Sequence, residues 1–301
     1  MSAGSAPMSP AQRQRVGVVL FAAVVGISTS AVLVKGMTAS PVAVAAWRTA
    51  GAAWLLAPAW VPAWRRLDGV VRLRLLGAGL ALAVHFVLWF ASLDLTTVLR
   101  STLLVCTTPV WAGLLDAVID RRLPTKPWVA GVLVALPGVG LMSGASGGEV
   151  SLLGDGLAVA GAVAAAVYLR LGQAVRSTVG AAAAMGAMCA VAAVALWVAA
   201  GVTQAQMLGF DARTWALLVA AVLGPQLVGH QGFTYAMRWV PASTLAVIVL
   251  LEPVGAAILA ALVFGEIPTA WSLAGGLLVL GGVGIAVGMP RRPQRQGSVP
   301  V

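Results

Sequence analysis

The sequence predicts an all-α integral membrane protein with ten transmembrane helices, arranged as two inverted five-helix repeats. Three observations carry this prediction. Hydrophobic residues occupy 60% of the 301 positions and charged residues only 9%, whereas a soluble domain carries about 25% charged residues. The apolar residues fall in runs of about 20, the length that crosses a bilayer as a helix. Finally, the second half of the chain repeats the pattern of the first.

The apolar runs define the ten expected helices in chain order. They cover residues 16–34, 42–62, 74–93, 98–119, 128–144, 153–170, 180–200, 214–237, 242–264 and 270–288. The first run is followed at once by another span, so we interpret it as an anchor and not as a cleaved signal peptide. Residues 1–14 are expected to form a disordered cytoplasmic N-terminus, and residues 289–301 a basic cytoplasmic tail.

The internal repeat appears when residues 98–143 are aligned with residues 242–287, because fifteen of the 46 pairs are then identical. The informative pairs are prolines and glycines: Pro109/Pro253, Pro124/Pro268, Gly131/Gly275, Gly138/Gly282 and Gly140/Gly284. The only two histidines, His85 and His230, coincide at nearly the same offset. We predict one repeat over 15–145 and a second over 150–288. Repeated sets of spans are typical of transporters whose substrate site lies between the halves.

The basic residues predict the orientation of the chain. With the N-terminus in the cytoplasm, 15 of the 19 lysines and arginines fall in inner segments, and the outer loops hold only Lys35 and Arg213. This positive-inside bias places both termini in the cytoplasm, in the plasma (inner) membrane. The net charge of +10 is therefore an orientation signal, and no nucleic-acid partner is expected. Because each half has an odd number of helices, the halves must be inverted.

Several motifs give the chain a family resemblance. The most specific are Leu251-Glu252-Pro253-Val254, Phe264-Gly265-Glu266, Gly229-His230-Gln231-Gly232-Phe233 and His85-Phe86-Val87-Leu88-Trp89. With them, the region from Arg15 to about Val287 resembles the EamA-type transporters of the drug/metabolite transporter (DMT) superfamily. The resemblance implies the ten-helix inverted-repeat fold and an exporter or exchanger of small metabolites. The chain departs from many relatives at Thr234, where they carry Asn, and at Arg122, where they carry Glu.

Few ionisable side chains lie inside the spans, where each costs roughly 2.5–3.5 kcal/mol on insertion scales and usually faces a cavity or a partner. They are Arg48, His85, Arg100, Asp116, His230 and Glu252. Glu252 lies at the centre of its span and precedes Pro253. It is interpreted as a cavity carboxylate that binds a cationic group or exchanges protons, or alternatively as a packing carboxylate bonded to a neighbouring helix. Arg48 either pairs with Glu252 or extends to the external surface.

The two histidines predict a polar lining for the same cavity. Trp89 follows His85 at i+4, and Thr234 follows His230 at i+4, so each pair lies on one helix face. Gln226 precedes His230 by one turn, and we expect it to lie on the same face. The alternative is that both imidazoles are neutral and hydrogen-bond between helices. The substrate-binding residues predicted from sequence are therefore Glu252, His85, His230, Trp89, Gln226, Arg48 and Thr234.

These features favour a secondary active transporter, an efflux carrier or exchanger of amino acids, amines or drug-like solutes that works by alternating access. Its expected partners are a small-molecule substrate, the lipid bilayer and, as a candidate coupling ion, protons. The alternative is a non-transporting membrane scaffold or accessory subunit. The sequence has no His-Glu-x-x-His or Gly-x-Ser-x-Gly motif and only two cysteines, Cys106 and Cys189. We therefore expect no enzyme activity, no metal site and no cofactor.

Overall fold

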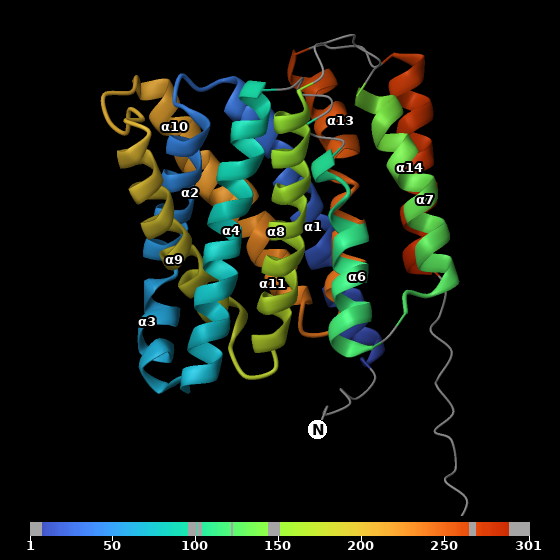
Figure 1. Cartoon of the computed structure of the whole chain (residues 1–301), viewed down its shortest axis with the longest axis horizontal. Helices are drawn as coiled ribbons and strands as arrows, with labels where there is room; N and C mark the ends of the chain where they lie inside the picture. Colours follow the sequence, from blue (N-terminus) through green and yellow to red (C-terminus); the bar gives the residue numbers. More distant parts are fainter. Residues whose placement is uncertain are drawn as a thin grey trace, which may run out of the picture.

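The computed structural model describes residues 8–95, 101, 104–121, 123–143, 151–264 and 269–288. Within these ranges the chain is helical apart from turns and short connections, and no residue there forms a β-strand. Figure 1 shows the helices side by side, running between an upper and a lower end. The expected basic tail, together with Arg100, Arg122 and Glu266, lies outside the described residues.

The first half of the chain contains α1 (Pro10–Lys35), α2 (Pro41–Leu55), α3 (Ala57–Arg66), α4 (Gly69–Leu95), α6 (Thr108–Asp120) and α7 (Lys126–Ser143). The second half contains α8 (Leu152–Val175), α9 (Ala181–Val202), α10 (Ala212–Ala221), the π-helix η1 (Val222–His230), α11 (Gln231–Ala236), α12 (Ala242–Val249), α13 (Glu252–Phe264) and α14 (Ala270–Gly288).

The described residues contain seven helices that are long and apolar enough to cross a membrane. The other three expected spans are broken, short or partly outside the described residues. The span expected at 42–62 is divided into α2 and α3, and the span at 98–119 includes residues outside the described ranges. In the third, the apolar part of α7 extends only over Lys126–Leu141. Over its described residues the protein is thus an all-helical integral membrane protein, with seven candidate spans by length and composition.

Side-chain caps set several of the helix starts. Helix α1 begins at Pro10, earlier than the boundary expected at residue 15, because Ser9 and Gln12 form a reciprocal capping box. Three other helices have simple side-chain caps: Ser40 caps α2, Ser151 caps α8 and Asp211 caps α10. Each of these side chains accepts a hydrogen bond from a backbone N–H in the first turn. The segment expected to be disordered over 1–14 is therefore helical from Pro10 onward.

Helix packing follows the internal repeat. With the sequence offset of the repeat, each of four helices in the first half has a counterpart in the second. Helix α1 corresponds to α8, α2 to α9, α7 to α14, and α4 to the segment α10–η1–α11. Helix α4 packs along α8, and correspondingly α1 packs along η1 and α11. Helix α2 packs against its own counterpart α9, and α7 against its counterpart α14. This is the contact pattern that a two-fold relation between the halves produces.

The repeated glycines lie where α7 and α14 touch. A β-carbon on Gly138 would lie 2.7 Å from the carbonyl oxygen of Gly275, and one on Gly282 would lie 2.6 Å from that of Gly131. Gly131 corresponds to Gly275 and Gly138 to Gly282, so these two contacts are equivalent under the repeat. The glycines are conserved between the halves because any side chain would separate these two helices.

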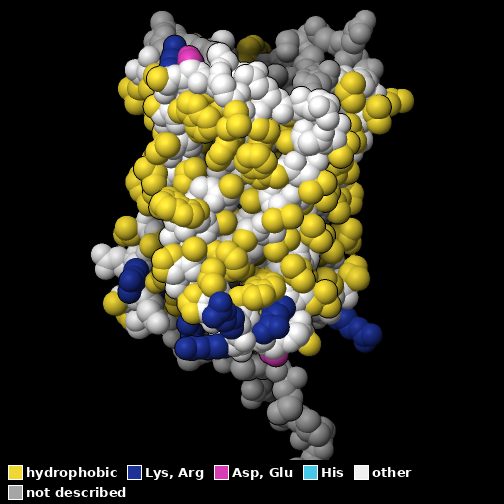
Figure 2. All heavy atoms as spheres, turned by 90° about the vertical axis from the view of Figure 1, so that its left-hand side faces the viewer, with side chains coloured by type: hydrophobic (Ala, Val, Ile, Leu, Met, Phe, Trp, Pro, Cys, Tyr) yellow, Lys and Arg dark blue, Asp and Glu magenta, His cyan; other side chains and the backbone are white. Residues whose placement is uncertain are grey.

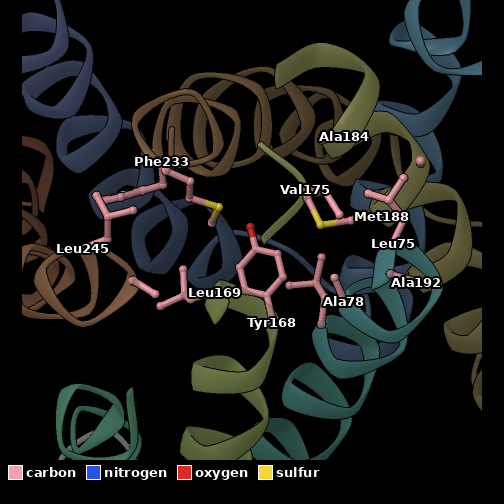
Figure 3. Packing of buried hydrophobic residues seen from close by; sticks show 14 of the residues in the cluster. Leu75, Ala78, Tyr168, Leu169, Val175, Ala184, Met188, Ala192, Phe233 and Leu245 are labelled. Carbon is pink, nitrogen blue, oxygen red and sulfur yellow. The ribbon is translucent and has the colours of Figure 1, made fainter. Parts of the chain in front are cut away.

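The largest buried cluster lies between helices of both halves (Figure 3). Leu75 near the start of α4, Val175 at the end of α8 and Met188 of α9 meet there, with Phe233 of α11 and Leu245 of α12. Because α4 belongs to the first half and the others to the second, this cluster fixes the two halves against each other.

The outer surface is apolar, as a lipid-facing surface must be. Trp54, Leu133 and Leu277 are each more than two-thirds exposed, at 74%, 67% and 71%. Figure 2 shows hydrophobic side chains over the middle of the molecule and most of the visible arginines and lysines at its lower end. The exposed apolar area of a soluble protein is seldom so continuous.

Candidate functional site

Side chains from both repeats meet in one cluster inside the helix bundle. The seven residues predicted from sequence lie on five of the helices. Arg48 is on α2, His85 and Trp89 are on α4, Gln226 and His230 are on η1, Thr234 is on α11 and Glu252 begins α13. The structure brings some of them into contact and separates others.

Arg48 is the centre of the cluster and is buried at 5% exposure. Its Nη1 donates to Ser30 Oγ at 3.3 Å, and its Nη2 lies 3.4 Å from His230 Nε2. The guanidinium also lies over the Phe86 ring, 4.6 Å from the ring centre. Arg48 therefore points inward and does not extend to the surface. Because arginine has only donors, His230 must accept through Nε2, as a neutral imidazole.

The two histidines approach the same phenylalanine. The His85 and Phe86 ring centres are 5.2 Å apart, and the Phe86 and His230 ring centres are 6.3 Å apart. His85 Nδ1 donates to the carbonyl oxygen of Gly161 at 3.0 Å, which joins α4 to α8. Its ring also stacks on Trp89, at 5.8 Å and 21°. The histidines thus combine an interhelical hydrogen bond with aromatic contacts.

Glu252 lies at a break in the ninth expected span. Helix α12 ends at Val249 and α13 begins at Glu252, directly before Pro253, which has no N–H to continue the helical ladder. The backbone carbonyl of Glu252 accepts a hydrogen bond from Ser28 Oγ at 3.3 Å. No hydrogen bond or ion pair joins its carboxylate to another described residue, and the side chain is partly exposed. The carboxylate nevertheless interacts electrostatically with Arg48.

The hydrogen bonds of Gln226 and Thr234 go to groups other than the charged side chains. Gln226 is fully buried, and its Nε2 donates to Cys189 Sγ at 3.2 Å and approaches Met185 Sδ at 3.7 Å on α9. The Thr234 hydroxyl donates to the His230 carbonyl at 2.9 Å. Gln226 thus contacts α9, whereas the His230 ring contacts Arg48 of α2 and Phe86 of α4.

Four residues of the cluster were not predicted from sequence. Ser28 and Ser30 of α1 contact Glu252 and Arg48, Phe86 lies between the histidines, and the Tyr168 ring of α8 is 6.3 Å from His230. The polar run Ser28-Thr29-Ser30 inside an apolar span was an available signal. Tyr168 had one too, since the chain has only two tyrosines.

The cluster contains no evident metal ligand set. In the described part of the chain, no three His, Cys, Asp or Glu side chains gather within reach of one ion. Cys106 and Cys189 are both free thiols. What the cluster does offer is one buried cation, one carboxylate without a fixed partner, and aromatic faces, at the place where the two repeats meet.

Comparison with known proteins agrees with this arrangement. The profile of the EamA-like transporter family matches residues 15–144 and, a second time, residues 152–288. A solved structure, described only as the crystal structure of a protein, superposes with a TM-score of 0.77 at 19% identity, over 92% of this chain and 99% of that one. At that identity it shows a similar fold alone. No curated protein matches the sequence.

Proposed function

This chain belongs to the EamA-like transporter family, and from that premise we propose that it is a secondary active carrier of small zwitterionic or cationic solutes. Members of the family are membrane transporters of the DMT superfamily and not enzymes. The proposal extends to an efflux carrier or exchanger that moves amino acids, amines or drug-like solutes by alternating access. We also propose the full set of ten spans, a plasma-membrane location and cytoplasmic termini at the lower, arginine-rich end (Figure 2).

The observation that carries the proposal is a buried cation and a carboxylate that form no ion pair with each other in the described structure. Arg48 keeps its Nε without a hydrogen bond, and the Glu252 carboxylate is bonded to no described residue. Charges inside a membrane protein are costly unless they are paired. A solute with an amine for Glu252 and a carboxylate for Arg48 would supply both missing partners.

The aromatic rings suit the remainder of such a solute. Phe86, Trp89 and Tyr168 surround the histidines and present π-faces and apolar edges. Such faces attract ammonium groups and bury apolar solute atoms. The site draws on both repeats, so relative movement of the repeats would change access to it from either side.

The test is counterflow and uptake in liposomes that contain the purified protein, with pooled amino acids, amines and nucleosides. We expect saturable flux that falls roughly ten-fold or more in Glu252→Gln, because a hydrogen bond to a charged group contributes about 1.5–3 kcal/mol. Asp211→Asn is the matched control, since Asp211 is an exposed cap of α10 outside the cluster. Its flux should equal that of the wild type.

Two results would contradict the proposal. One is the absence of saturable flux in every pool from protein that is folded and inserted, which would favour a scaffold. The other is undiminished flux in Glu252→Gln.

Proton coupling is tested in the same vesicles with an imposed pH gradient. If Glu252→Gln left gradient-driven flux intact, protons would not be coupled through this carboxylate.

A further inference from the structure

A second feature lies on the lipid-facing side of the bundle, away from the central cluster. It is a groove of about 420 Å³ between α3, α4 and α9, lined by Trp60, Trp64, Leu76, Leu80 and Val194 over a floor that includes Ala190. Figure 2 faces the side of the molecule on which these helices lie. The lining side chains are all apolar or aromatic, so in a membrane this groove holds hydrocarbon.

Tight packing beneath the groove fixes its shape. The Trp60 ring lies against Gly186 of α9, where a β-carbon would also be only 2.9 Å from Leu56 Cβ. Trp60 Nε1 donates to the Ala53 carbonyl at 2.8 Å, across the break between α2 and α3. On the other wall, a β-carbon on Gly79 would lie 2.6 Å from Val191 Cβ. The small residues bring the helices together below, and the large side chains form the rims.

Positive charge is concentrated at one end of the groove. Arg72 precedes Leu76 by one helical turn, on the same face of α4. Its Nε donates to the Trp64 carbonyl at 3.1 Å, and its Nη2 donates to the Arg65 carbonyl at 3.2 Å. These bonds hold the guanidinium beside the Trp64 ring, 5.9 Å from the ring centre. Arg65 and Arg66, in the last turn of α3, are exposed at the same end.

The one acidic side chain in the adjoining α3–α4 turn is already engaged. Asp68 Oδ1 accepts a hydrogen bond from the Val71 N–H at 2.8 Å and so caps α4. Arg72 uses only two of its five N–H donors in the bonds above. The end of the groove therefore presents excess positive charge and free donors directly beside an apolar channel.

We propose that the groove binds one anionic phospholipid. An acyl chain lies between Trp60, Leu80 and Val194, and the phosphate binds Arg72 with help from Arg65 and Arg66. The argument is complementarity: clustered basic residues beside a membrane helix bind anionic head groups, and tryptophans at that depth mark the boundary between head groups and hydrocarbon. A zwitterionic lipid would fill the groove equally well but would gain less from the arginines.

Native mass spectrometry tests this proposal on the full-length protein in detergent, supplied with phosphatidylglycerol or phosphatidylcholine of the same acyl chains. We expect the wild type to retain phosphatidylglycerol preferentially. Arg72→Gln should reduce that preference about five-fold, since a basic residue near a membrane surface contributes about 1 kcal/mol. Ala190→Phe, which places a ring in the groove, should reduce retention of both lipids.

Arg238→Gln is the matched control. Arg238 is exposed and also lies beside a tryptophan, with its guanidinium 5.7 Å from the Trp239 ring centre, but it does not line this groove. The proposal predicts no change in lipid preference for this variant. Equal retention of the two lipids by the wild type, or equal losses in Arg72→Gln and Arg238→Gln, would overturn it. Thermal melting of each variant separates loss of lipid from loss of fold.

Discussion

At the scale of single residues, the arrangement depends on the shape of Arg48 as well as its charge. The planar guanidinium reaches Ser30 and His230 through different nitrogens and lies over the Phe86 ring. A lysine ammonium is a compact point charge that cannot make this set of contacts. We therefore expect lysine at position 48 to function less well than arginine, although both carry one positive charge.

We predict that Arg48→Lys lowers apparent substrate affinity about ten-fold, because it loses one charge-assisted hydrogen bond of about 1.5 kcal/mol. The measurement is the KM for counterflow in liposomes. Arg238→Lys is the control, since Arg238 is exposed and outside the cluster. An unchanged KM in Arg48→Lys would mean that only the charge at position 48 matters.

The residues of this cluster were easier to predict from the sequence than the directions of their side chains. Burying a charge in a membrane costs free energy, and this cost allowed Arg48, His85, His230 and Glu252 to be selected as candidate site residues from the sequence alone. Which way Arg48 points depends on its neighbours in space, and no pattern in α2 decides between the interior and the surface. Gln226 illustrates a second limit, because nothing in its own segment shows that its side chain contacts Cys189 and Met185 of α9.

At the scale of helices, hydropathy located spans but not their interruptions. An averaging window contains apolar residues on both sides of a break, so it cannot detect the division of α2 from α3 or of α12 from α13. Proline was the available signal for these features. Pro58 lies in the first turn of α3, Pro225 lies within η1, and Pro253 follows Glu252 at the start of α13. Each removes a backbone donor from its helix.

The glycine contact between α7 and α14 gives a prediction at this scale. Gly282→Val should destabilise the protein by about 1–3 kcal/mol, the usual cost of overpacking, because its β-carbon would meet Gly131 O at 2.6 Å. Gly281→Val is a control on the same helix, where a β-carbon meets nothing within 4 Å. Thermal unfolding in detergent should separate the two variants. Equal melting temperatures would contradict the close packing of these helices.

At the scale of the whole molecule, the two repeats are joined by charge as well as by the buried cluster of Figure 3. Arg170 of α8 pairs with Asp120 of α6 at 2.7 Å and with Asp116 of α6 at 3.6 Å. Helix α6 belongs to the first repeat and α8 to the second. Both acidic residues lie in the last turns of α6, at the lower end of the bundle (Figure 1).

This pairing matters if the protein works by alternating access, because the lower end must then open and these ion pairs must separate. Partly exposed ion pairs contribute about 0–1 kcal/mol each. Removing both pairs should therefore shift the equilibrium between closed and open forms by about five-fold toward the open form. The direction of the shift follows from the geometry, since the pairs exist only when the lower end is closed.

The reporter for opening is a cysteine at Leu169, which is buried at 5% exposure in the last two turns of α8, in a protein whose native Cys106 and Cys189 are replaced by alanine. We predict that Asp116→Asn with Asp120→Asn raises the rate at which a water-soluble maleimide labels this cysteine about five-fold. Asp68→Asn removes a charge from the loop before α4 without breaking a pair between the repeats, so its labelling rate should not change. Equal rates in both backgrounds would mean that Arg170 contributes nothing to closure.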